Sequence, residues 1–485
     1  MLESVKNIFA IPDLRKKVFY TLLMIAITRI GVHIPTPFID SEQVRGFFSN
    51  TESGIFGMVD MFTGGGFQNM SIMVIGIMPY ISAQIILQLM MVVVPALEKM
   101  RKEGEAGQKR IEQYTRYGAM GLATVQAISV VAFMIVQGFV IPSLAEATFL
   151  FIPGWFIFAV IGVLSIVTGT AILMWIGEQI TANGVGNGIS LIIALGILAS
   201  YPSAAYLFYL DTSNGIQPRI FVPIILGLGI VTTVLIIMVQ EGARRIPIQH
   251  ARRTVGRRVQ QGQTNYLPLK VNTAGVIPVI FSSAILAALS QLTSWLGEGG
   301  GAINFLQGSW AAYFIPNSTK NLYVFLGIES GSIFNLLKMV NLYVILEATI
   351  IAFFCFFYTA VTFNPSDVAD NLKKAGAFVP GFSPGQQTAN YIDRVLTRIT
   401  TVGAVFLVVV ALIPLSLHVS FDMNFTYTQF AGGTGLIIIV GVVLDTMKKV
   451  ESELLMHNYD GFRSRRQAEG ARKRYSGTGS GKAIT

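Results

Sequence analysis

Apolar stretches of about 20 residues recur along most of the chain, and their length restricts its fold more than any other feature. A helix needs roughly 20 residues to cross the hydrocarbon core of a bilayer, whereas a strand needs about 10. Apolar residues make up 52% of the 485 and charged residues 13%, about half the usual share in soluble domains. A backbone in lipid must satisfy its hydrogen bonds internally, as long helices do. The sequence therefore predicts an all-α polytopic membrane protein.

Ten membrane-spanning helices are predicted from these stretches. They lie near residues 18–36, 69–95, 115–138, 152–176, 188–206, 218–240, 272–293, 336–361, 399–416 and 432–447. The first span follows a lysine-containing segment but lacks a small-residue cleavage site, so it is expected to be retained and is not a signal peptide. Cys355 is the only cysteine, which excludes an intramolecular disulfide.

Lysine and arginine gather on one side of the predicted membrane. Thirty of the 35 fall in the N-terminal segment, the loops 96–117, 241–270 and 362–398, and the C-terminal tail. The other five are Arg29, Arg45, Arg219, Lys320 and Lys338. Because basic loops stay in the cytoplasm, both termini and the long basic loops are predicted to be cytoplasmic. This topology explains the net charge of +9 and gives no reason to expect a nucleic-acid substrate.

Two short motifs occur twice, which suggests that the chain is built from two similar halves. The sequence at 76–81 resembles that at 275–280, and the sequence at 188–193 resembles that at 433–438. The motifs fall in spans two and seven and in spans five and ten, so each half holds five spans. Because five is odd, the second half enters from the opposite side, which makes an inverted repeat. The predicted units are an N-terminal half (1–210), a C-terminal half (211–460) and a basic tail (461–485) that is expected to be disordered.

A segment at about 55–68, between the first two spans, is apolar enough to enter a membrane but too short and glycine-rich to cross it. An ordinary re-entrant or interfacial loop would fit this pattern. A movable stopper also fits, because three consecutive glycines make a hinge conformationally cheap. The candidate stopper residues are Phe56, Met58, Met61, Phe62, Gly64, Gly65 and Gly66.

Several segments make the chain similar to the SecY family. They are 71–89 (SIMVIGIMPYISAQIILQL), 101–107 (RKEGEAG), 113–118 (QYTRYG), 267–280 and 369–381. The resemblance covers essentially residues 1–460. It implies a protein-conducting channel of the bacterial plasma membrane that passes unfolded secretory polypeptides and releases signal sequences and transmembrane segments sideways into lipid. The family fold has an hourglass pore, a plug, a hydrophobic constriction, and a lateral gate between spans two and three and spans seven and eight.

The resemblance places the pore constriction at six isoleucines. They are Ile81, Ile85, Ile189, Ile193, Ile280 and Ile438. A narrow apolar ring dewets and blocks ions, and it offers a passing chain no specific hydrogen bond. Ile81 matches Ile280 in one repeated motif, and Ile193 matches Ile438 in the other, as a pore on the pseudo-axis would produce. An isoleucine in a membrane helix can also simply be packed or face lipid.

The lateral gate implied by the family is expected to involve Pro79, Gln126, Pro278 and Ser283. Each proline removes a helical hydrogen bond inside a span, which produces either an ordinary kink or a flexible helix beside the gate. Gln126 and Ser283 are candidates for a polar seam between the halves. Neutral polar contacts between membrane helices are worth only about 0.6 kcal/mol on average, so such a seam can open.

The two long basic loops at 241–270 and 362–398 are expected to bind partners. Arginine, in which the first loop is dense, suits phosphate and carboxylate groups, and in the family these loops dock the SecA motor and the ribosome. The candidate docking residues are Arg244, Arg245, Arg252, Arg253, Arg257, Arg258, Lys373 and Lys374. Ser366 departs from the arginine that family members often carry after Asn-Pro, which puts one partner contact in doubt. The resemblance also implies SecE and SecG subunits, a translocating polypeptide with its signal sequence, and membrane lipids as partners.

Two other functions fit parts of the sequence. An inverted-repeat secondary transporter would need ionisable or unwound coordinating sites near the midplane, and Glu347 in the eighth span is the only clear candidate. A membrane protease is the enzyme alternative, but the four histidines lie in loops or near span ends and no HExxH motif occurs. No enzyme activity, catalytic residue, cofactor or metal is therefore predicted.

Overall fold

The computed structural model describes residues 11–51, 60–141, 148–149, 152–250, 253–255, 258–260, 264–286, 342–421 and 423–477. The helices of the first part are α2 (Pro12–Val32), α3 (Ser41–Thr51), α5 (Met78–Val93), α6 (Pro95–Lys102), α7 (Glu105–Val136), α9 (Gly154–Asn183), α10 (Gly188–Ser213) and α11 (Phe221–Glu241). A short helix, Ile277–Leu286, comes next. It is followed by α15 (Leu342–Thr362), α16 (Pro365–Lys374), α17 (Gln386–Phe421), α18 (Phe425–Thr428), the 3-10 turn η3 (Gln429–Ala431) and α19 (Gly433–Gly477).

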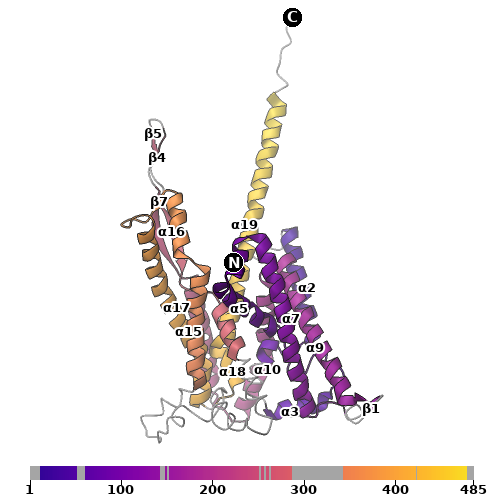
Figure 1. Cartoon of the computed structure of the whole chain (residues 1–485). Coiled ribbons are helices and arrows are strands. Elements are labelled where there is room, and N and C mark those ends of the chain that lie inside the picture. Colours follow the sequence, from indigo (N-terminus) through magenta and orange to yellow (C-terminus); the bar gives the residue numbers. More distant parts are fainter. Residues whose placement is uncertain are drawn as a thin grey trace, which may run out of the picture.

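These helices form an upright bundle in which each of the ten predicted spans overlaps one helix (Figure 1). In the described part of the chain, six helices are long and apolar enough to cross a membrane alone. Two bent pairs, α5 with α6 (100°) and the α18–η3 segment with α19 (45°), raise that number to eight. The chain is thus an all-α polytopic membrane protein, as predicted.

The predicted start of the second span at residue 69 is wrong by nine residues, because 69–77 form turns and α5 begins at Met78. Gly76 takes a left-handed conformation (φ 64°) just before the helix. The seventh span begins in the same way: Gly275 has φ 65° and the helix starts at Ile277. A residue in the left-handed conformation does not continue a right-handed helix, and glycine adopts that conformation without steric cost.

Both repeated motifs therefore mark the beginning of a helix. Within the first motif, the Ile81 N–H donates to the Ile77 carbonyl (3.2 Å), and in its second copy the Ile280 N–H donates to the Val276 carbonyl (3.1 Å). The second motif opens α10 at Gly188 and α19 at Gly433. The same local backbone thus recurs in spans two and seven, whereas in spans five and ten only the helix start recurs, since Gly433 has φ 95° and Gly188 has no positive φ.

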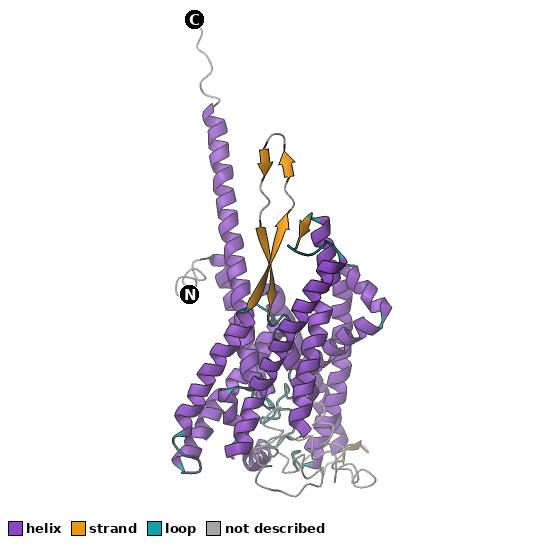
Figure 2. Cartoon of the chain, turned by 90° about the vertical axis from the view of Figure 1, so that its left-hand side faces the viewer, coloured by secondary structure: helices purple, strands orange, loops and turns teal. Residues whose placement is uncertain are grey.

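The predicted basic loop at 241–270 forms an antiparallel hairpin that projects from the bundle (Figure 2). Its strands are β3 (Ala243–His250), β4 (Arg253–Val255), β5 (Arg258–Gln260) and β6 (Thr264–Lys270). The strand β7 (Ala377–Phe378) pairs with β3, so the two predicted docking loops share one sheet of order β6-β3-β7. A further pair, β1 (Thr148–Phe149) and β2 (Ile152–Pro153), lies near the opposite end of the bundle.

The start of α2, the end of α19, the hairpin and α16 lie toward one end of the bundle, whereas α3 and β1 lie at the other (Figure 1). The described basic segments therefore share one end of the bundle; that this end is cytoplasmic stays a prediction.

The C-terminal tail differs from its prediction over 461–477, where α19 continues as a helix to Gly477. Residues 448–477 contain no proline and are rich in Glu, Leu, Arg, Lys and Ala, which favour helix.

Candidate functional site

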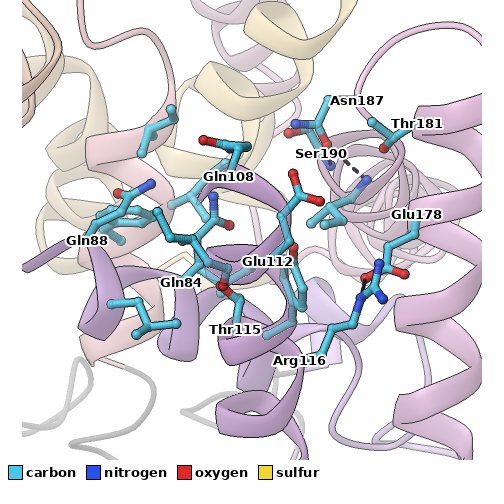
Figure 3. A pocket seen from close by; sticks show the side chains of 18 of the residues that line it. Gln84, Gln88, Gln108, Glu112, Thr115, Arg116, Glu178, Thr181, Asn187 and Ser190 are labelled. Carbon is cyan, nitrogen blue, oxygen red and sulfur yellow. Dashed lines mark hydrogen bonds and ion pairs between the residues drawn. The ribbon is translucent and has the colours of Figure 1, made fainter. Parts of the chain in front are cut away.

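A cavity of about 710 Å³ lies in the bundle, between helices of both halves. Part of its wall is polar, and Figure 3 shows Gln84 and Gln88 of α5 close to Gln108, Glu112 and Arg116 of α7. On α5 the lining begins at Tyr80 and Ile81 and continues through Gln84 and Gln88, with Leu87 and Met91 between and beyond them. The lining therefore combines polar side chains, which can bind water, with apolar ones, which cannot.

The six isoleucines of the predicted ring come together in one apolar region. Four of them line the cavity, namely Ile81, Ile189, Ile193 and Ile280. Ile85 and Ile438 belong to the same apolar core as the others, against which Ile189 packs. The six isoleucines come from α5 and α10 of the first half and from the 277–286 helix and α19 of the second. That they form the seal of a pore stays a prediction.

The predicted stopper, the plug, is a compact turn that contacts the isoleucine region. Met61 and Phe62 are buried in the same core, whereas Phe56 and Met58 lie outside the described residues. The Asp60 carboxylate accepts hydrogen bonds from the backbone N–H groups of Phe67 (3.0 Å) and Gln68 (2.9 Å).

The turn reverses direction at the triple glycine of the plug. Gly64 and Gly65 have φ of 67° and 91°, and Gly64 and Gly66 are buried. Left-handed residues in succession explain why this sequence carries glycine there.

The two gate prolines do not kink their helices, so the predicted kink is wrong, while their place in a lateral gate stays a prediction. Pro79 and Pro278 are each the second residue of a helix. The N–H groups of a first helical turn have no intrahelical partner, so proline costs nothing there and fixes a favourable φ. Gln126 is half-buried on α7, and Ser283 is buried with its hydroxyl donating to the Ile280 carbonyl (2.9 Å).

A polar contact between the halves was not anticipated from the sequence. Arg101 on α6 donates to the Val361 carbonyl near the end of α15 (3.0 Å), and both residues line the cavity. A second missed contact joins two helices of the first half, where Arg116 of α7 meets Glu178 of α9 at 2.6 Å (Figure 3). Neither pair has a local sequence signature, because its partners are 260 and 62 residues apart.

The predicted docking residues lie on the projecting sheet and beside it. Arg244 and Arg245 are exposed on β3, and Lys373 and Lys374 are exposed at the end of α16. Arg253 and Arg258 lie in β4 and β5, while Arg252 and Arg257 fall outside the described residues. The N–H of Ser366 donates to the Asn364 side chain, so Ser366 has a place in the N-terminal cap of α16.

Glu347 is buried in α15, one turn from the buried Tyr343. In the described part of the chain it is not among the residues that line the cavity. A transporter would need its ionisable residue in the substrate path, so the geometry does not favour that alternative.

The fold and the cavity define a polytopic helical membrane protein with a large internal cavity that borders an apolar core. Residues 71–447 match the model of the SecY family. The protein translocase subunit SecY of Vibrio cholerae is 40% identical over 450 residues, 93% of this chain and 94% of that protein. Its counterpart in Pseudomonas aeruginosa is 40% identical over 463 residues, 95% of each chain. The chain belongs to the SecY family.

The fold is also that of a solved structure described as a protein conducting channel. The two superpose with a TM-score of 0.60 at 19% identity, over 90% of this chain and 92% of the other.

Proposed function

We propose that this chain is the central subunit of a Sec protein-conducting channel. It passes unfolded secretory polypeptides across a membrane and releases signal sequences and transmembrane segments sideways into lipid. The observation that carries the proposal is the cavity whose polar wall ends at the isoleucine region, with Met61 and Phe62 of the plug in the same core. Membership of a family whose relatives are protein translocase subunits supports it.

The two kinds of lining serve different parts of the task. Hydrated side chains such as Gln84 and Gln88 exchange hydrogen bonds easily with water and with the backbone of an unfolded chain. The isoleucines exclude water and ions when no chain is present, since a narrow apolar constriction dewets. Passage needs only that side chains separate, so the channel performs no covalent chemistry.

The orientation of the channel in the membrane follows from its charge. The end that carries the hairpin and both termini faces the cytoplasm of a bacterial cell, and the bundle spans the plasma membrane. SecE and SecG complete the channel, and lipids surround it. SecA or a ribosome docks on the sheet of β3, β6 and β7 and on α16, and delivers a polypeptide with its signal sequence.

A secretory precursor stalled in transit tests the proposed function. A photo-crosslinking amino acid at Ile85 or Ile280 should join the precursor in membranes that also contain SecE, SecG and SecA. The same probe at Ile230, which is 66% exposed on α11, should not, because that side chain faces lipid. Crosslinks of equal yield at all three positions, or at none, would contradict a central path.

Reversal of the exposed charges on the sheet should weaken docking without changing the membrane fold. In Arg244→Glu/Arg245→Glu, each lost contact with a carboxylate or phosphate removes on the order of 1 kcal/mol, so SecA or ribosome affinity should fall roughly tenfold or more. Binding to reconstituted channels measures this at physiological salt.

The matched control for docking is Arg219→Glu, since Arg219 is exposed but follows α10, at the end opposite the hairpin. It should bind SecA and ribosomes as the parent does. If Arg244→Glu/Arg245→Glu also keeps the parental affinity, the sheet is not the docking surface.

A further inference from the structure

The first span carries a charge that the proposed pore, gate and docking surface leave unexplained. Arg29 is the only charged residue between Val18 and Val32 and lies in the last turn of α2. Charged side chains in membrane helices are costly, so they face the bundle interior and find partners there. Arg29 follows this rule: its side chain is directed to the plug.

The guanidinium contacts the plug at the triple glycine. Its Nη1 donates a hydrogen bond to the Gly64 carbonyl at 3.2 Å. Its Nε is buried and has no hydrogen-bond partner among the described residues. Among the described residues, the hydrogen bond from Nη1 to Gly64 is therefore the one that the guanidinium makes.

Two glycines make room for this contact. A Cβ at Gly64 would lie 2.6 Å from Nη1 of Arg29 and 2.9 Å from the Cα of Gly196 on α10. A Cβ at Gly196 would lie 3.0 Å from the Phe62 carbonyl. The plug backbone is thus enclosed between the arginine of α2 and the glycine of α10.

Among the described residues 60–66, this is the hydrogen bond that reaches a helix of the bundle. The other hydrogen bonds of residues 60–66 join them to one another or to the turn that follows, as between Asp60 and Gly65. In the described part of the chain, Arg29 is therefore the polar tie between this segment and a helix of the bundle. Met61 and Phe62 add apolar contacts, but these are not directional.

We propose that Arg29 is a positioning residue that holds the plug closed, acting through the Gly64 carbonyl. The inference rests on the proposed function, in which the plug leaves this place when the channel opens. A hydrogen bond from an ionised donor is stronger than a neutral one, and a planar guanidinium fixes direction as an ammonium does not. Displacement of the plug must break this bond, so Arg29 biases the resting channel toward closure.

Accessibility of a plug cysteine tests the role directly. In a background of Cys355→Ser and Met61→Cys, reconstituted with SecE and SecG, a membrane-impermeant thiol reagent reports how often the plug leaves its site. Arg29→Met should raise the labelling rate roughly tenfold or more, as loss of a hydrogen bond to a charged group allows. Resting ion conductance should rise with it, and Arg29→Lys should fall between Arg29→Met and the parent.

Thr28→Val is the matched control on the same helix. Thr28 is buried beside Arg29, but its hydroxyl donates to the Ile25 carbonyl of α2 and not to the plug. Its labelling rate should remain parental. A parental rate in Arg29→Met, or an equal increase in both variants, would overturn the proposal.

A second pair of variants separates crowding from backbone strain. Gly64 and Gly65 both have positive φ, so alanine is strained at either position. Only at Gly64 would its methyl meet Arg29, since the nearest atom at Gly65 is 4.0 Å away, on Asn69. Labelling should therefore be faster in Gly64→Ala than in Gly65→Ala, and equal rates would count against the contact.

The labelling assay needs no precursor, so it separates the two proposals. Failure of the crosslinks at Ile85 and Ile280 with a clear Arg29 effect would remove the translocation function but leave the plug contact. Normal crosslinks with no Arg29 effect would remove only the positioning role.

Discussion

Glycine in place of Ile438 or Ile193 should raise the resting ion conductance of the channel in planar bilayers. Both isoleucines are buried in the shared core, at 0% and 3% exposure. Each substitution removes four side-chain carbons, or about 3 kcal/mol of apolar burial at ~0.8 kcal/mol per carbon. The dewetted, closed state depends on that apolar lining. The population of the conducting state should therefore rise roughly tenfold or more. Precursors with defective signal sequences should also pass more readily, since opening costs less.

A lipid-facing isoleucine provides the control for helix propensity. Ile230→Gly introduces the same glycine into α11, where the side chain is 66% exposed. It should lose about 1 kcal/mol of helix stability, as glycine does elsewhere, without changing conductance. Parental currents in Ile438→Gly and Ile193→Gly, or equal currents in all three variants, would show that the isoleucines do not form the seal.

The helices themselves were predictable because length and hydrophobicity decide them. Their ends were not, as the second span shows. Residues 69–77 are as apolar as the helix that follows, so hydropathy alone merges them. The physical boundary is the left-handed Gly76 followed by Pro79 in the first turn, a combination that typically starts a helix. The same signal at Gly275 and Pro278 would have corrected the seventh span.

The apolar part of the site was accessible from the sequence, but its polar contacts were not. Repeated motifs and family resemblance pointed to Ile81, Ile193, Ile280 and Ile438, which the structure brings into one core. In the sequence, Arg29 stood out only as one of the five basic residues outside the predicted cytoplasmic segments. Its partner is a backbone carbonyl 35 residues away, and any residue has a carbonyl. The contact therefore depends on tertiary structure alone.

The hairpin was predicted as a loop because its strands are short and amphipathic. Ile246 and Ile248 of β3 are buried while Arg244 and Arg245 are exposed, so the apolar residues alternate only briefly. High charge hid this alternation. Pairing of β3 with β7, about 130 residues later, could not be anticipated from either segment.

A crosslink between α5 and the 277–286 helix should stop secretion when it is short. A signal sequence carries an apolar core of about 7–15 residues, and each Leu, Ile, Phe or Val gains roughly 0.3–0.6 kcal/mol at the membrane centre. In the proposed channel it reaches lipid by passing sideways between these helices, because the axial path leads only to water. The Arg101 bond to the Val361 carbonyl lies at the cavity wall of the same two halves, so it too must yield or bend.

The gate is tested with cysteine pairs in a Cys355→Ser background. One cysteine replaces Ser82 or Ile86 on α5, and the other replaces Ser283 or Leu286. The serine at 355 is tolerable, because a hydroxyl there can donate one turn back, as the Thr359 hydroxyl does to the Cys355 carbonyl (2.7 Å). At least one pair should be bridged by a bifunctional reagent in the resting channel.

The length of the bridge then separates a lateral gate from a plain pore. A short linker between the best pair should abolish export of a secretory precursor, because it keeps the two helices from separating. A long flexible linker should restore export, because it allows them to separate. Single-cysteine variants treated with the same reagent should export normally, which excludes damage by modification alone. A simple pore or a transporter would be indifferent to linker length. Export through a short-locked channel, or the absence of any bridged pair, would place the exit for signal sequences elsewhere.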